Sequence, residues 1–139
     1  MSLVRAEAVA VAKNGHAILD GVAISAAAGE VVGLIGPNGA GKTTLMRIMC
    51  RLQRPNAGEV LIEGQDVRQL DRRRLARTIA YLAQGAECHW PLSVERVVAL
   101  GRLPHLGPWQ QPGTEDARAV DEAMHEADVA SLGSRPLDT

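Results

Sequence analysis

Residues 36–44 read Gly-Pro-Asn-Gly-Ala-Gly-Lys-Thr-Thr and fit the pattern G-x-x-x-x-G-K-[ST], which is typical of a phosphate-binding loop. Such a loop joins a strand to a helix. Residues 30–35 form a short run of mostly branched apolar side chains, which predicts a buried strand. After the loop, apolar side chains at helical spacing predict one face of an amphipathic helix: Leu45, Ile48, Met49 and Leu52. The competing interpretation is a glycine-rich turn that contains a lysine by chance.

The chemistry expected of this loop follows from its backbone. Glycines permit positive φ and close approach, so the amides from about Asn38 to Thr44 can converge on phosphate oxygens. The N-terminus of the helix starting near Lys42 adds free amides and a favourable dipole. We expect Lys42 to reach the β- and γ-phosphates and the Thr43 hydroxyl to ligate Mg²⁺. The predicted nucleotide-binding residues are Gly36, Asn38, Gly39, Ala40, Gly41, Lys42, Thr43 and Thr44.

Composition excludes several classes of function. The chain has 139 residues, with 15 Lys or Arg against 16 Asp or Glu, so its net charge of −1 creates no field that recruits nucleic acid or membrane. No uncharged apolar stretch approaches the roughly 20 residues of a membrane span, and the first residues do not resemble a secretory signal. Cys50 and Cys88 are far apart, which suits reduced thiols in the cytoplasm.

Further strands are predicted on both sides of the loop. Residues 3–11 and 18–24 alternate between apolar and polar side chains, and Asn14-Gly15 supplies a turn between them. After the loop, residues 59–64 and 78–82 are also predicted to be strands.

Three helices are predicted in the second half of the chain. Asp71 is a candidate N-cap for residues 72–77, and Ser93 for a helix with Val94, Val97 and Val98 on its apolar face. Thr114, followed by two acidic residues, starts the third. Its expected apolar side consists of Val120, Ala123, Met124 and Ala127.

The chain resembles the first half of the nucleotide-binding subunit of an ABC transporter. The resemblance rests on the loop, on Gly29-Glu30, on 57–60 (Ala-Gly-Glu-Val) and on 79–84 (Ile-Ala-Tyr-Leu-Ala-Gln). It implies an α/β fold, the N-terminal portion of an ABC-type P-loop NTPase with a small antiparallel β subdomain, the P-loop strand and helix, the start of a helical subdomain and an incomplete core sheet. It implies that residues 1–86 form the β subdomain and part of the nucleotide-binding core, and that residues 87–139 form the truncated beginning of the helical subdomain. The implied ligands are ATP and Mg²⁺.

The resemblance assigns roles beyond the loop. In that family the glutamine at the position of Gln84 contacts Mg²⁺ and the γ-phosphate region, and the segment after it docks on a membrane-spanning permease subunit. Gln84 is therefore expected to act as a sensor and, with Thr43, as a Mg²⁺ ligand; the alternative is a polar residue at a strand end. The resemblance also implies a second nucleotide-binding subunit as dimer partner, and a peripheral location on the cytoplasmic face of the cell membrane.

The stretch 101–105 (Gly-Arg-Leu-Pro-His) is similar to the G-R-x-P-H segment of importers for iron-siderophore, haem or cobalamin. It favours that subfamily by analogy. The alternative is structural: Gly101 and Pro104 stop a helix, and His105 is a surface histidine.

Two departures from the family are visible. The family stacks adenine on an aromatic residue before the loop, whereas residues 11–16 offer only His16 as a candidate adenine contact. The Asp-Glu strand, the later histidine and the L-S-G-G-x signature, which hydrolysis requires, are absent from these 139 residues. We therefore expect nucleotide binding without hydrolysis, either as a fragment of the importer ATPase or as a non-catalytic module or gene remnant. The transported substrate would be chosen by other subunits.

Other candidate sites are weaker. The cluster Arg72, Arg73, Arg74 and Arg77 lacks interleaved aromatics and is expected to be a solvated helix face, not a nucleic-acid site. The four histidines and two cysteines lack metal-ligand spacing. Trp90 and Pro91 either form an apolar docking surface for the membrane subunit or pack internally.

Overall fold

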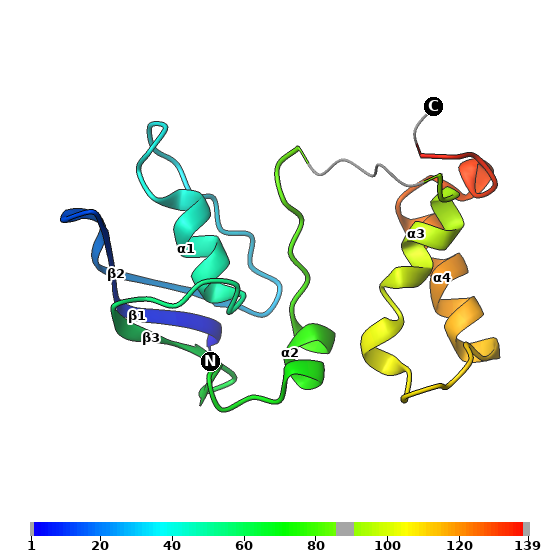
Figure 1. Ribbon diagram of the computed structural model, residues 1–139, viewed down its shortest axis with the longest axis horizontal. Coiled ribbons are helices and arrows are strands. Elements are labelled where there is room, and N and C mark those ends of the chain that lie inside the picture. The colour runs from blue at the N-terminus through cyan, green and yellow to red at the C-terminus, as the bar shows by residue number, and fades with distance from the viewer. Residues whose placement is uncertain (1, 86–90, 138–139) are drawn as a thin grey trace. The chain divides into compact units, whose positions relative to one another are not determined.

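The computed structural model describes residues 2–85 and 91–137 (Figure 1). The chain divides into two compact units, Met1–Leu75 and Ala76–Thr139. The division falls inside helix α2 (Arg72–Thr78).

The first unit contains an antiparallel sheet with strand order β2-β1-β3-β4 (Figure 1). Its strands are β1 (Ser2–Lys13), β2 (His16–Ala27), β3 (Ala57–Ile62) and β4 (Gln65–Asp66). The predicted strands at 3–11, 18–24 and 59–64 are thereby confirmed, with β1 and β2 longer at both ends and β3 shifted by two residues.

The turn between β1 and β2 forms where the sequence predicts it. Asn14 and Gly15 have φ of 51° and 77°, as a two-residue hairpin turn with positive φ at both positions requires. Lys13 and His16 are paired across it.

β1 and β3 approach each other closely at a bulge. The register shifts between Glu7 and Ala10, and Ala8 has a φ of 48°. Gly58, opposite this bulge, has a φ of 84°, and a Cβ built on it would lie 2.4 Å from the carbonyl oxygen of Ala8. Only glycine fits, because both the conformation and the space exclude a side chain.

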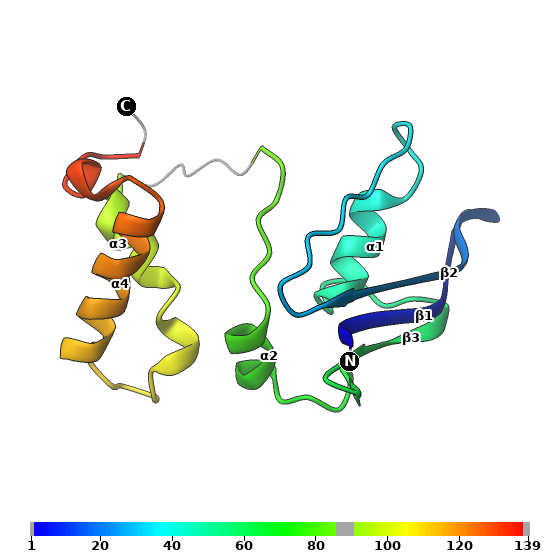
Figure 2. The ribbon, with the colours of Figure 1, turned by 180° about the vertical axis from the view of Figure 1, so that it is seen from behind.

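Helix α1 (Lys42–Met49) lies over one face of the sheet (Figures 1 and 2). Leu45 and Ile48 are buried, as predicted, together with Val9 and Val60 of the sheet. Leu52 is 61% exposed, so its predicted place on the apolar face is wrong. The helix ends before it, and Arg51, with a φ of 56°, turns the chain away.

Two predicted strands do not form. Residues 30–35 and 79–83 have no regular secondary structure, and Thr78 ends α2. The side chains of Val31 and Ile35 are each 98% exposed, and Leu82 is 86% exposed. A strand needs a neighbour to receive its backbone hydrogen bonds, and within residues 2–85 and 91–137 no segment is paired with either stretch.

The second unit consists mainly of α3 (Val94–Leu100) packed with α4 (Thr114–Glu126). Two short 3₁₀ turns, η1 (Leu103–His105) and η2 (Ala130–Leu132), follow these helices.

The predicted caps can be compared with the observed ones. Asp71 Oδ2 accepts hydrogen bonds from the amides of Arg73 and Arg74, at 3.1 and 3.2 Å, and Ser93 Oγ accepts one from Arg96 at 3.4 Å. Both predicted caps are confirmed. α4 begins at Thr114, as predicted.

On α4 the apolar face is narrower than predicted. Val120 and Met124 are buried, whereas Ala123 and Ala127 are exposed. The buried stripe follows i, i+4 spacing from Asp116, because α3 covers one narrow side of the helix.

Candidate nucleotide-binding site

The loop at 36–44 turns through two left-handed glycines. Gly39 and Gly41 both have a φ of 84°, and between them the amide of Ala40 donates to the Pro37 carbonyl at 3.3 Å. α1 then begins at Lys42, and no side chain caps its first turn. Its first amides therefore point out of the helix without a capping partner, which is the arrangement that binds an anion.

Gly41 is required by its surroundings as well as by its conformation. A Cβ on it would lie 2.6 Å from Leu19 Cδ2 and 2.9 Å from the Ile18 carbonyl oxygen. The loop therefore rests directly on β2. The pattern G-x-x-x-x-G-K-[ST] marks the glycine, but it gives no signal for Ile18 and Leu19, which support it from more than twenty residues away.

Lys42 folds back over the loop. Its Nζ donates to the carbonyl oxygens of Gly36 and Pro37, both at 2.7 Å. The ammonium group has three donors, so these two bonds leave one for another acceptor. Lys42 is thus held at the loop by weak neutral acceptors that charged phosphate oxygens could replace.

The remaining loop residues lie where the pattern predicts them. Thr43 is exposed and Thr44 half-buried, both in the first turn of α1. Asn38 and Ala40 are exposed on the loop itself. The structure thus gathers all eight predicted loop residues, and their contacts with a nucleotide stay a prediction.

The two outlying candidates are placed differently. His16 is exposed and begins β2, two residues before the Ile18 carbonyl that supports Gly41, so it starts within roughly 7 Å of that contact along the strand. Gln84 is exposed and belongs to the second unit, whereas Thr43 belongs to the first. A shared Mg²⁺ site for Thr43 and Gln84 therefore stays a prediction.

Magnesium fits this site only in the company of a phosphate ligand. Among the residues that the structure describes, no group of three or more His, Cys, Asp or Glu could hold a metal ion. Mg²⁺ is commonly bound by one or two protein oxygens together with substrate phosphates and water. The exposed Thr43 hydroxyl beside the open amides suits that mode.

The stretch 101–105 is linked to the start of α4 by polar contacts within the second unit. Arg102 Nε lies 2.9 Å from Asp116 Oδ1, and the Gly113 amide donates to Asp116 Oδ2 at 3.0 Å. The hydrogen bond from Gly113 and that from Arg102 lower the pKa of Asp116. Gly101 caps α3, and the Pro104 carbonyl accepts from Arg77 at 2.9 Å. These contacts support the structural interpretation of this stretch.

Two further candidates can be placed. The arginines of α2 at 72, 73, 74 and 77 are exposed, as expected for a solvated helix face, and His105 is exposed in η1. Trp90, Cys88 and the segment directly after Gly85 lie outside the described residues, whereas Pro91 is exposed.

The sequence as a whole matches a known family. The ABC transporter family matches residues 19–139, which include the loop, Gln84 and the stretch 101–105. The chain belongs to the ABC transporter family.

Two curated relatives of this family member illustrate the similarity. The cobalamin import ATP-binding protein BtuD of Halobacterium salinarum is 43% identical over 124 residues, which cover 88% of this chain and 30% of that protein. The iron(3+)-hydroxamate import ATP-binding protein FhuC of Bacillus subtilis is 30% identical over 138 residues, covering 99% of this chain and 51% of that protein. The chain thus spans about half the length of these relatives or less.

A solved structure confirms the fold. A nucleotide-free ATP-binding cassette from an ABC transporter superposes with a TM-score of 0.82 at 24% identity, covering 99% of this chain and 58% of that chain. The predicted fold class, the N-terminal portion of an ABC-type P-loop NTPase, is confirmed. Across the described parts of this ABC family chain, no helix is long and apolar enough to cross a membrane.

Proposed function

We propose that the chain is the ATP-binding portion of an ABC importer's ATPase subunit. The geometry of the loop is the main support for this proposal. Gly39 and Gly41 have left-handed conformations, the amides at the start of α1 are uncapped, and Lys42 is held against the loop. This geometry presents backbone donors and one ammonium group to a triphosphate. The names of the two relatives, both import ATP-binding proteins, support the assignment.

Each loop residue then has a stated role. The amides of residues 38–44 would bind phosphate oxygens, Lys42 the β- and γ-phosphates, and Thr43 with Gln84 the Mg²⁺ that accompanies ATP. His16 would contact adenine from the start of β2. Because a histidine stacks less extensively than tyrosine, affinity would depend mainly on the triphosphate.

The partners follow from the same assignment. Residues after Gln84 would dock on a membrane-spanning permease subunit, and a second nucleotide-binding subunit would complete a dimer at the cytoplasmic face of the membrane. The functional boundary would lie after residue 86, between the nucleotide-binding core and the helical subdomain. The transported substrate would be an iron-siderophore, haem or cobalamin; the names of the two relatives, for cobalamin and iron(3+)-hydroxamate import, support this class.

Replacing the loop lysine tests nucleotide binding. Lys42→Ala removes the ammonium group facing the phosphates, and we expect ATP affinity to fall about 10- to 100-fold, because a charge-assisted hydrogen bond is lost. Isothermal titration with Mg·ATP measures the change. Arg47→Ala, which removes an exposed positive charge from the same helix, is the matched control and should leave affinity within about twofold. Unchanged affinity in Lys42→Ala would refute the assignment.

Hydrolysis is a separate question. The 139 residues carry no metal-holding aspartate strand or signature motif, so we propose that this polypeptide binds ATP without hydrolysing it. Steady-state phosphate release from residues 1–139 should equal the rate without protein. Turnover comparable to that of a complete ABC ATPase would contradict this part of the proposal and leave the binding assignment intact.

A further inference from the structure

A cavity of about 350 Å³ lies at the other end of α1, away from the phosphate-binding loop. It is formed by the last turn of the helix, the loop after it, β3 and the residues after β4. All of its lining belongs to the first unit. Its volume is at the lower end of the range of small-molecule sites, which is about 300–1,000 Å³.

Three arginines line this cavity. They are Arg51, Arg54 and Arg68, and the only acidic side chain that joins them in the lining is Glu59. The lining therefore carries three positive charges and one negative charge, a net of +2. Asp66 pairs with Arg68 without lining the cavity, and including it leaves a net of +1.

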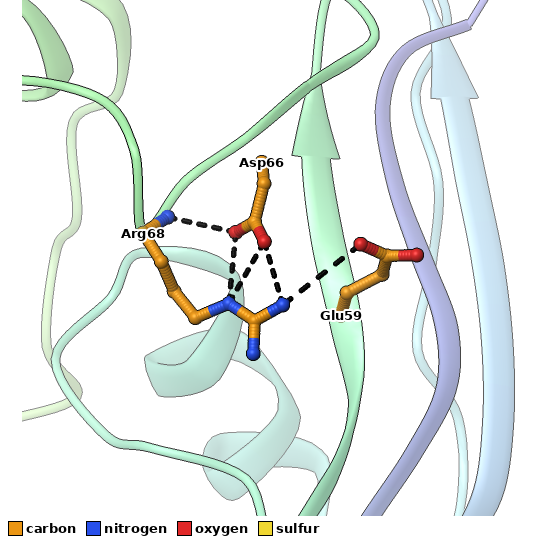
Figure 3. A network of polar contacts seen from close by, with 3 residues as sticks. All are labelled: Glu59, Asp66 and Arg68. Carbon is orange, nitrogen blue, oxygen red and sulfur yellow. Dashed lines mark hydrogen bonds and ion pairs between the residues drawn. The ribbon is translucent and has the colours of Figure 1, made fainter.

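Arg68 is fixed in place by acidic neighbours. Its Nε and Nη2 donate to Asp66 Oδ2 at 2.8 and 2.6 Å, and Nη2 lies 3.9 Å from Glu59 Oε2. Figure 3 shows its guanidinium between the two carboxylates, with the third nitrogen making no contact with either residue drawn. Arg68 is thus an oriented side chain with part of its donor set available.

Arg51 and Arg54 form no such close pair. Neither lies within ion-pair distance of a carboxylate within residues 2–85 and 91–137, although the charge of Arg51 contributes to lowering the pKa of Asp66. Arg51 donates one hydrogen bond, from Nη1 to the Leu70 carbonyl at 2.7 Å, and Arg54 is exposed. Arg51 also holds a left-handed backbone, with a φ of 56°, at a helix end where glycine is usual.

The remainder of the lining is apolar. Its accessible apolar surface comes mainly from the half-buried Pro55, and Ile48, Val60 and Val67, which are 1%, 2% and 5% exposed, lie beneath as the floor of the cavity. A purely inorganic anion would leave this floor unused, whereas a ligand with an apolar body could cover it. Guanidinium groups bind phosphate and carboxylate oxygens through paired N–H donors.

We propose that this cavity binds a small organic phosphomonoester, with its phosphate at Arg51, Arg54 and Arg68 and its apolar body against Pro55 and the apolar floor. A phosphomonoester presents three strong acceptor oxygens to the three guanidinium groups, whereas a carboxylate presents two. The site is separate from the loop at 36–44 and does not depend on the function proposed for that loop.

The test uses phenyl phosphate as probe on the whole chain. Its binding is measured by isothermal titration and by amide and Arg Nε shifts in ¹H–¹⁵N spectra. All titrations are done in Lys42→Ala as well as in the unaltered chain, because the loop at 36–44 is itself a phosphate site. Shifts confined to 36–44 and lost in Lys42→Ala would overturn the proposal.

The variants test the contribution of Arg54 to binding. Arg54→Gln should weaken phenyl phosphate at least about tenfold, and Arg54→Lys should weaken it less, because it keeps the charge but loses the paired donors. Arg47→Gln removes an exposed arginine outside the cavity and is the matched control, with an expected change below about twofold. Equal losses of phenyl phosphate affinity in Arg54→Gln and Arg47→Gln would show a general effect of charge and would refute specific binding in the cavity.

Two other probes distinguish the ligand class. Benzoate keeps the ring and carries one negative charge, and inorganic phosphate keeps the charge without the ring; both should bind at least about fivefold more weakly than phenyl phosphate. Benzoate binding as tightly would overturn the choice of phosphate, and inorganic phosphate binding as tightly would overturn the role of the apolar floor. Absence of binding by phenyl phosphate at millimolar concentration would refute the site. ATP titration of the same variants reports separately on the loop.

Discussion

The strand β3 and the segment 30–35 have similar apolar sequences and different structures. β3 lies between β1 and β4, with Val60 2% and Ile62 4% exposed. Residues 30–35 form no strand, and Val31 and Ile35 are each 98% exposed. An apolar run therefore does not make a strand unless another segment satisfies its backbone groups and covers its side chains.

Breaking the contact between β1 and β3 should have the largest effect. In Gly58→Ala the new Cβ meets the backbone of Ala8 and the φ of 84° becomes strained, so we expect a loss of about 4 kcal/mol in the free energy of unfolding. Urea denaturation followed by β-sheet circular dichroism measures it. Gly64→Ala is the control, since Gly64 has a φ of 80° but nothing within 4 Å, and it should cost only about 1 kcal/mol. Similar losses in both variants would show that the close approach does not matter.

A matched pair of isoleucines makes the comparison direct. Ile62→Ala removes a buried side chain from β3 and should cost about 3 kcal/mol, whereas Ile35→Ala in the exposed segment should change stability by less than about 0.5 kcal/mol. The same urea titration applies to both. A comparable loss in Ile35→Ala would mean that residues 30–35 are packed in solution, and the contrast between the two segments would disappear.

The smallest expected effect is on the pH dependence of stability that comes from the Asp66–Arg68 pair at the β3–β4 hairpin. The side-chain hydrogen bond from Arg68 is the main cause that lowers the pKa of Asp66 from its ordinary 3.8. A lowered folded-state pKa means that this pair stabilises the fold fully above pH 3.8, and that the contribution is lost as pH falls through the folded value. Asp66→Asn should therefore lower the urea midpoint at neutral pH and lose this difference at low pH.

The control for this prediction is Asp20→Asn, which alters an exposed aspartate of β2. It should give the same midpoint difference from the unaltered chain at neutral and low pH. A difference for Asp66→Asn that persists unchanged in acid would show that Arg68 does not stabilise the ionised carboxylate.

The loop of the candidate site and several turns and caps of the fold could be predicted because their signals are local. The loop pattern, the turn at Asn14-Gly15 and the caps at Asp71 and Ser93 each involve residues within a few positions of one another. Backbone conformation at such places depends on the residue types themselves. These features were therefore predictable from sequence alone.

Other features could not be predicted in this way. On α4 the buried face is narrow and leaves Ala123 and Ala127 exposed, because α3 covers only part of the surface of α4. The cavity at the end of α1 brings together Arg51, Arg54 and Arg68 without any regular spacing. The stretch 101–105 resembles a family segment, but the ion pair of Arg102 depends on Asp116, which lies on α4.

The sequence by itself determined the glycine-rich loop at 36–44 and the helix that follows it, the hairpin of β1 and β2, and membership of the ABC transporter family. Tertiary structure decided which apolar runs became strands, that β2 supports Gly41 through Ile18 and Leu19, and where the arginine-lined cavity lies. The physical reason is that turns and caps form from neighbouring residues, whereas strand pairing, burial and close backbone approach require partners distant in sequence.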